Sequence, residues 1–571
     1  MQDTMDKALM LPEILACIGN MLDNNNIISC MQVCKAWRTE FEPRLWRSFT
    51  LKQLEPDYVG LRPDLALLKK NAHHIRSLVI KQMDSALQDF FMRCKQLEEV
   101  RFDAQEVDDG DGVAQMWDRF SDMIDNHSRL RKIVIDTVPW PMTNKVLETM
   151  ERCPKLIVLE SKETELDVVK SQLYLRLCSK NLRRLSTWAD DYDHPEFPEH
   201  LIFQEMRYLD ICHATGISMD KQLTWLSRCP NLVSFRWEAW ADQVDVAKLC
   251  TILSGGTCPD LTALHLIVTL ADDEIAQILE AAPRIEKLSL PRTGFGELSM
   301  DALRRHFPTL RDINLQFCSK VTSPMVQEIL RSCANLQSIS AESLARSDII
   351  QHPWACRNLQ MFDVGIDFVD ETDGYDPPMS HFKEVYQRLS LLTELNYLSI
   401  CSENQADTDS RDPIEVSLEA GLDELATLKK LTFFSCKTLL NNSHPSEGFK
   451  VMEWMVEHWK RLETFEASKS IAVMGAIGDD GNTIEPYAMD LLRDNGIKFS
   501  EFFSSGRGLD YDHDDDYDED EWTDQEDYED DGYDMDDFET YEHYGPIDFS
   551  SNDEYADQYA RYMVQQYSSL E

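Results

Sequence analysis

The sequence has no long apolar run and lacks the common catalytic motifs. The apolar stretch 8–22 is interrupted by Glu13, well short of the roughly 20 residues that a membrane helix needs, and no basic segment precedes it. No GxSxG elbow, P-loop, dinucleotide-binding glycine cluster or HExxH helix occurs. We therefore expect a protein that is not an enzyme, needs no cofactor and does not bind a membrane.

Paired cysteines of the CxxC type, which are typical of zinc and redox sites, are also missing, although the chain has 15 Cys. Cys30 and Cys34 fall on the apolar stripe of a predicted helix. Five others follow a helical segment and precede an apolar residue, namely Cys153, Cys229, Cys258, Cys333 and Cys356. We interpret them as small buried apolar residues, expect no metal site, and infer a reducing cytoplasmic or nuclear location.

Positive charge is scarce, with 56 Lys and Arg against 103 Asp and Glu. Residues 509–571 hold 25 of these acids and one base, and residues 510–542 alone contain 20 acids interleaved with aromatic residues. The tail, residues 508–571, is predicted to be disordered, with a short helix at 553–570. It is either a solubilising segment or an arm that binds a basic surface. The charge excludes nucleic acid as the main partner, and a basic protein partner fits better.

Apolar residues in the first fifty positions recur at helical spacing. Leu11, Ile14, Leu15, Ile18 and Leu22 form one face of a helix that Pro12 enters at its first turn. A second helix begins at about Asn26 and presents Ile27, Cys30, Met31 and Cys34 on one stripe, widened by Val33 and Trp37; Leu45 and Trp46 follow it. Three short helices cannot bury two Trp side chains, so this unit is expected to dock on a partner or on the rest of the chain.

Three blocks of this region, Leu11-Pro12-Glu13-Ile14-Leu15, Val33-Cys34-Lys35-x-Trp37 and Leu45-Trp46, resemble the F-box in order and spacing. The resemblance covers about 11–51 and implies binding to a Skp-family adaptor, and through it to a cullin-RING ligase. The alternative is a plain three-helix cap on the repeats that follow. The residues implied to contact the adaptor are Leu11, Pro12, Ile14, Leu15, Ile18, Leu22, Ile27, Cys30, Val33, Cys34, Trp37, Leu45 and Trp46.

A six-residue phrase, L-x-x-L-x-L, recurs fifteen times with helical segments between its copies. Its fourth position is always apolar, and its sixth is large and apolar except at Ser161, Thr187, Ala341 and Ala467. Each unit predicts a short strand and a helix that stack on their neighbours, giving a curved parallel sheet inside and helices outside. This pattern resembles the leucine-rich repeats of the Cys-containing kind. Its first positions are Ile75, Leu97, Leu130, Leu156, Leu182, Met206, Leu232, Leu261, Ile285, Leu310, Leu336, Leu359, Leu395, Leu428 and Leu462.

The predicted architecture is α/β, a three-helix F-box followed by a leucine-rich-repeat solenoid and an acidic tail. The boundaries are 8–51 for the F-box, 52–71 for a linker, 72–468 for about 15 repeats, 469–507 for a C-terminal cap and 508–571 for the tail.

The third and fifth positions of each phrase are predicted to face the concave surface, because side chains alternate along a strand. This surface is either a recognition surface for a protein target or a merely solvated sheet face. His265 lacks a nucleophile placed beside it by the sequence and is not interpreted as a catalytic base. The predicted target-binding residues are Arg101, Lys132, Arg184, Tyr208, Asp210, Arg236, Trp237, His265, Lys287 and Asn314.

These patterns predict a substrate-recognition subunit of a Skp/cullin/F-box ubiquitin ligase, with the F-box on the adaptor and the repeats on an unknown protein target. One alternative is an acidic-tailed leucine-rich-repeat protein that binds basic partners such as histones without a ligase role. Another is the GTPase-activating protein of the Ran system, which is also a repeat array with an acidic tail. Neither alternative family begins with an F-box.

Overall fold

The computed structural model divides the chain into two units, Met1–Arg507 and Gly508–Glu571. The residues described here all belong to the first unit, so the predicted acidic tail and its helix at 553–570 lie outside them. The structure describes residues 11–19, 21–22, 24–51, 65–81, 88–103, 111–136, 142–161, 168–188, 201–212, 219–239, 244–368, 378–400, 416–436, 445–468 and 485–502.

Three short helices begin the described chain: α2 (Pro12–Gly19), α3 (Asn24–Met31) and α4 (Lys35–Leu45). The sequence predicted Val33 and Trp37 on the second helix, but α3 ends at Met31 and Cys34 adopts an extended conformation as the N-cap of α4. Trp37 therefore lies on the third helix. The three helices enclose a small core of their own, centred on Leu15, Ile27 and Phe41.

Seventeen strands form one sheet in which each strand pairs in parallel with the next along the chain, from β1–β2 to β16–β17. Parallel order with a helix between most neighbours is the arrangement that the repeated phrase predicted. The strands are β1 (Ser48–Leu51), β2 (Ser77–Ile80), β3 (Glu99–Phe102), β4 (Lys132–Ile135), β5 (Val158–Ser161), β6 (Arg184–Trp188), β7 (Tyr208–Cys212), β8 (Ser234–Glu238), β9 (Ala263–Ile267), β10 (Lys287–Ser289), β11 (Asp312–Leu315), β12 (Ser338–Ala345), β13 (Met361–Asp367), β14 (Tyr397–Ser399), β15 (Phe433–Cys436), β16 (Thr464–Ser468) and β17 (Lys498–Phe502).

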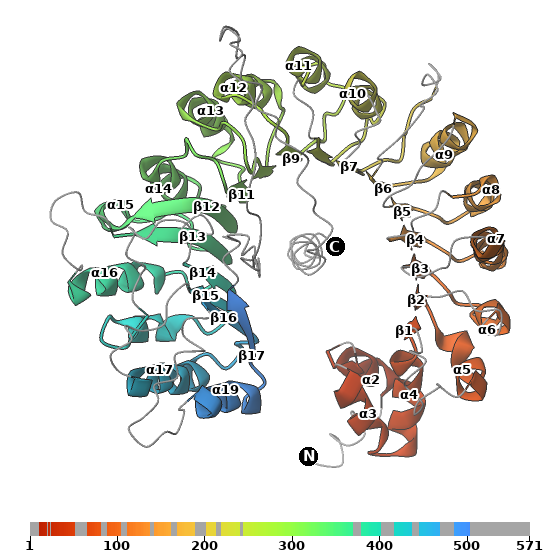
Figure 1. Cartoon of the computed structure of the whole chain (residues 1–571), viewed down its shortest axis with the longest axis horizontal. Helices are drawn as coiled ribbons and strands as arrows, with labels where there is room; N and C mark the ends of the chain where they lie inside the picture. The colour runs from red at the N-terminus through yellow and green to blue at the C-terminus, as the bar shows by residue number, and fades with distance from the viewer. Residues whose placement is uncertain are drawn as a thin grey trace, which may run out of the picture. The chain divides into compact units, whose positions relative to one another are not determined.

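The helices cover the outer face of this sheet, and the opposite face of the strands is the inner surface (Figure 1). Within the part of the chain that is described, no helix is both long enough and apolar enough to cross a bilayer. The helices are α5 (Leu65–Asn71), α6 (Gln88–Arg93), α7 (Asp111–Asp125), α8 (Asn144–Arg152), α9 (Val168–Lys180), α10 (Met219–Ser227), α11 (Val246–Ser254), α12 (Asp272–Ala281), α13 (Glu297–Leu303), α14 (Ser323–Ser332), α15 (Arg346–Gln351), α16 (Met379–Leu389), α17 (Pro445–His458) and α19 (Glu485–Asp494), with the 3₁₀ turns η1 (Ala72–His74), η3 (Arg304–His306) and η5 (Leu422–Thr427).

The first, fourth and sixth positions of the phrase are buried between the strands and the helices, as predicted. Leu336, Ile339 and Ala341 illustrate the pattern, and their side chains belong to one continuous core that runs from the first repeats to Ile497. The small sixth positions are buried as well, and the Ser161 hydroxyl lies 3.1 Å from the hydroxyl of the buried Tyr174. The solenoid fold is thus confirmed.

One repeat was predicted in the wrong register. In β15 the buried first and fourth positions are Leu431 and Phe434, three residues later than the Leu428 start assigned from the sequence, and Phe434 pairs with Leu398 of β14. Leu428, Leu431 and Phe434 are spaced by three, so the phrase fits either start. The turn η5 decides between them, because it extends to Thr427 and delays the strand.

Most of the cysteines at the helix-to-strand junctions fill small apolar spaces. Cys229 is buried, and its thiol donates to the Trp225 carbonyl oxygen at 3.4 Å. Burial raises the pKa of Cys356 to about 12. Such thiols stay protonated at neutral pH and behave as the apolar residues that the sequence predicted.

Neighbouring repeats are also joined by a polar contact at the start of α13. The Asp272 carboxylate, from α12, accepts from the backbone N–H groups of Gly296 and Ser299 at 2.9 Å and of Leu298 at 3.1 Å. Partial burial works to raise the pKa of this carboxyl, but the Ser299 hydroxyl and these N–H donors outweigh burial and hold the pKa below its ordinary value. One repeat therefore caps the helix of the next.

We predict that Asp272→Ala lowers the free energy of unfolding by about 1–3 kcal/mol, because it leaves backbone donors at the start of α13 without their acceptor. Urea denaturation followed by circular dichroism measures the effect. Asp273→Ala is the matched control, since Asp273 is exposed and adjacent. Equal stability of the two variants would contradict the capping role.

Candidate functional site

Exposed apolar side chains gather in the N-terminal helices. Of the eleven large apolar residues that are exposed in the described part of the chain, four fall within residues 11–33: Leu11, Met21, Ile28 and Val33. Leu11 and Val33 were predicted as adaptor contacts, whereas Met21 and Ile28 were missed. Met21 is 87% exposed and follows α2; it comes three positions after Ile18, so the helical spacing could have included it. An apolar surface of this kind favours a protein partner.

The other predicted adaptor contacts differ in how far their side chains are buried. Pro12 is exposed, while Ile14, Ile18, Leu22, Cys30, Cys34, Trp37 and Leu45 are half-buried. Leu15 and Ile27 are 2% and 4% exposed inside the core of the three helices. They hold these helices together and, contrary to the prediction, are not placed to contact an adaptor.

Trp46 is half-buried and packs on a different core. It stands two residues before β1, as each first repeat position stands before its strand, and it packs against the continuous core of the solenoid. Its ring stacks on Phe49 of β1 with 5.8 Å between ring centroids. Trp46 thus joins the helices to the repeats.

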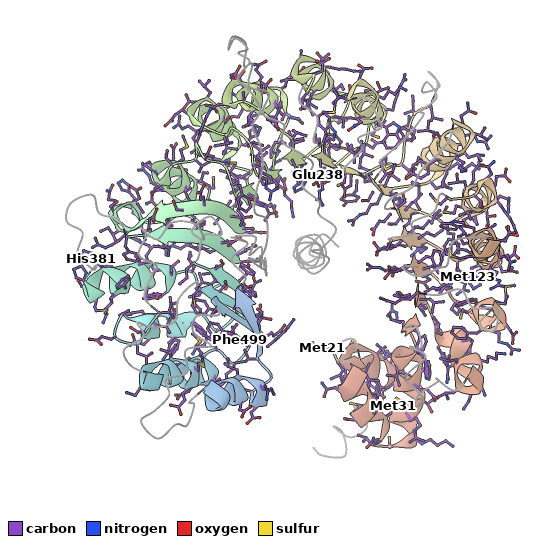
Figure 2. The ribbon with its side chains drawn as sticks, in the orientation of Figure 1. Met21, Met31, Met123, Glu238, His381 and Phe499 are labelled. Atoms are coloured by element: carbon purple, nitrogen blue, oxygen red, sulfur yellow. The ribbon has the colours of Figure 1, made fainter. Side chains whose placement is uncertain are left out.

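The inner face of the sheet carries the predicted target-binding residues at the third and fifth positions. Glu238, which comes two residues after Arg236 on β8, marks this face in Figure 2. Eight of the ten residues are exposed or half-buried: Arg101, Lys132, Arg184, Tyr208, Asp210, Arg236, Lys287 and Asn314. Trp237 is fully buried at a sixth position, and its indole N–H donates to Gln222 at 2.5 Å, so its prediction as a target contact is wrong.

The bases of this face are paired with carboxylates on their own or neighbouring strands. Lys132 Nζ lies 3.1 Å from Glu99 Oε1 and 3.9 Å from Glu160 Oε1. Arg184 Nε lies 3.6 Å from the same Glu160 oxygen. The acids Glu99 and Glu160 stand at a third and a fifth position, so aligning the phrases would have found them.

Three further bases extend the pattern. Arg101 pairs with the buried Asp136, Lys287 Nζ lies 2.9 Å from Asp312 Oδ2, and Arg236 lies 3.1 Å from Glu238 Oε2 and 3.8 Å from Asp210 Oδ1. The concave face is therefore balanced in charge and offers hydrogen-bonding groups of both signs. It does not present a net positive field.

His265 lies 9% exposed on β9 between the strands that carry Arg236 and Lys287. Burial, followed by the charges of Arg236 and Lys287, lowers the pKa of His265 to about 3. The ring is neutral at physiological pH and is held within the face. Among the described residues no group of three or more His, Cys, Asp or Glu side chains is arranged to hold a metal ion.

We predict that stability falls as the pH drops below about 6.5, the ordinary pKa of His. Because the folded-state pKa of His265 is lower than that value, the unfolded chain takes up the proton first. The loss is at most about 1.4 kcal/mol per pH unit from this residue. Urea midpoints of His265→Gln are expected to depend less on pH between 7 and 5 than those of the exposed His352→Gln control. Identical pH dependence would refute the assignment.

Comparison with known proteins identifies one segment of the chain. Residues 12–52 match the F-box-like family model. None of the curated proteins compared matches the sequence. A chain of the yeast Rad7 and Elc1 complex is similar at 15% identity and a TM-score of 0.37, covering 54% of this chain and 84% of that one.

Two other solved structures are similar to the chain at lower identity. The TLR13–ssRNA13 complex matches at 10% identity and a TM-score of 0.36, covering 70% of this chain and 56% of that one. The internalin inlF of Listeria monocytogenes matches at 12% identity and a TM-score of 0.25, covering 77% and 93%. The family match assigns an F-box-like segment to residues 12–52, and the repeats with their parallel sheet form a leucine-rich-repeat solenoid after it.

Proposed function

We propose that the chain is the substrate-recognition subunit of a Skp/cullin/F-box ubiquitin ligase. The observation that carries the proposal is the F-box-like match at 12–52, which covers three short helices; Leu11, Met21, Ile28 and Val33 are exposed on these helices or on the segments that flank them. In this role the helices bind a Skp-family adaptor, which connects the chain to a cullin scaffold.

The energetics of the exposed side chains support an adaptor contact. Full burial of a large apolar side chain is worth about 1.5–3 kcal/mol, so covering several of them supplies a substantial part of a stable association. Leu15, Ile27 and Phe41 contribute indirectly, because their packing holds the exposed residues in place. The adaptor thus meets a preformed surface, which lowers the entropic cost of binding.

The solenoid then holds the protein target. Its charge-balanced inner face suits a partner with alternating acidic and basic groups, which would exchange the pairs seen here for pairs across an interface. The junction at Trp46 fixes the repeats relative to the helices, so the target is held at a defined place beside the ligase. The receptor accelerates ubiquitin transfer by raising the local concentration of target lysines.

A second candidate function is a histone-binding role without a ligase, which the formal net charge of -47 favours. The charge-balanced concave face supports it less, because acids and bases alternate there. Salt-sensitive histone binding that survives loss of adaptor binding would distinguish this function from the first.

We predict that the double variant Leu11→Asp/Val33→Asp loses at least about tenfold in affinity for a Skp-family adaptor, since two charges would be placed against an apolar partner. Affinity purification of the intact chain, followed by titration with purified adaptor, measures the loss. Leu298→Asp, at an exposed leucine of the solenoid helix α13, is the matched control and keeps full binding. Adaptor binding that is absent from the intact chain, or unchanged in the double variant, would sink the proposal.

A further inference from the structure

A cationic cleft of about 620 Å³ lies where α4 meets the first repeats. Arg44 and Arg47 line it from the end of α4 and the turn that follows, His73 and His74 from η1, and Arg76 from the approach to β2. We call these five residues the junction cluster. They come from two parts of the chain that the predicted linker 52–71 separates.

The balance of charge in this cleft differs from that of the concave face. Glu40 is the one carboxylate among the described lining residues, against three guanidinium groups and two imidazoles. Arg47 is exposed and has no carboxylate within ion-pairing distance in the described part of the chain. Arg76 is exposed and lies 3.4 Å from Glu98, a pair that solvent screens strongly. Within the described residues, Arg47 therefore brings a positive charge that no carboxylate offsets, in a chain whose net charge is -47.

The two histidines add ring N–H donors to the cleft. The His73 and His74 rings lie 3.8 Å apart between centroids. Partial burial, followed by the neighbouring His73, lowers the pKa of His74, while Glu42 acts in the opposite direction. A neutral imidazole still offers one ring N–H group to an anion.

We propose that the junction cluster binds a phosphate-bearing anion. Guanidinium groups bind phosphate through two parallel N–H donors, and Arg47 and Arg76 line this cleft together with His73 and His74. The volume exceeds what a single phosphate fills and lies in the range of ligand sites, which suits a phosphate ester with a substantial organic part. The site is separate from both the exposed apolar residues of the helices and the concave face.

The cleft lies at the join between the F-box-like helices and the solenoid, so a bound ligand would affect that join. The Arg47 carbonyl oxygen accepts from the backbone N–H groups of Arg76 and Ser77 at 2.9 and 3.0 Å, which starts the β1–β2 pairing. A phosphate held by Arg47 and Arg76 would add side-chain contacts across the same join. The bound anion would therefore stiffen the connection between the F-box-like helices and the solenoid.

Calorimetry on the full chain tests the proposal with two phosphate sources, inorganic pyrophosphate and a phosphoserine peptide beside its unphosphorylated form. The intact chain is expected to bind at least one of them, and Arg47→Ala/Arg76→Ala is expected to bind it at least about tenfold more weakly. Arg284→Ala is the matched control, because Arg284 is exposed and its guanidinium lies 3.8 Å from Glu286. Circular dichroism and the urea midpoint check that each variant is folded.

Binding of pyrophosphate alone identifies a free phosphate ester as the ligand class, and binding of the phosphopeptide alone identifies a modified protein segment. Either result supports the site if Arg47→Lys keeps more affinity than Arg47→Ala. The proposal is overturned if neither probe binds the intact chain. It is also overturned if the double alanine variant binds as tightly as the control, or if the unphosphorylated peptide binds as well as the phosphorylated one.

Discussion

Apolar packing between successive repeats is the constraint on which the rest of this structure depends. A four- or five-residue strand with one helix cannot bury its own apolar face, so each unit is stable only against its neighbours. Leu336 before β12 and Ile339 and Ala341 on β12 show how the constraint is met, since their side chains enter a core shared along the whole sheet. The polar contacts follow the same logic: Asp272 caps a helix that belongs to the next repeat.

The same alternation that buries these positions fixes the inner face. Side chains at the third and fifth positions are brought into register with those of the strands beside them, about 4.8 Å away. Lys132 therefore lies between Glu99 and Glu160, and Arg184 reaches the second of these acids. Charges that are separated by about 25 residues in the chain become immediate neighbours, and the face is balanced as a result.

The repeat pattern also extends into the junction between the N-terminal helices and the repeats. Trp46 comes from the F-box-like segment but occupies the place of a first repeat position, and β1 extends the sheet beyond the repeats that the sequence identified. At the other end β17 continues the parallel pairing after the predicted last repeat. The helices are thus attached to the solenoid by the same apolar and hydrogen-bonding contacts that hold the repeats together, and the cationic cleft opens beside that attachment.

The sequence by itself determined the repeat fold, the three N-terminal helices and the positions that face inward, because each depends on local spacing of apolar residues. It did not determine the start of the sheet, where Trp46 and β1 precede the predicted repeats, or the register at Leu431, where a spacing of three allows two answers. Tertiary structure alone decided that Leu15, Ile27 and Trp237 are buried and that Arg101, Lys132 and Lys287 have acidic partners. It also decided that Arg47 and Arg76 share one cleft with His73 and His74. These features depend on which distant residues meet across strands and helices, and the periodicity of a single strand or helix carries no information about them.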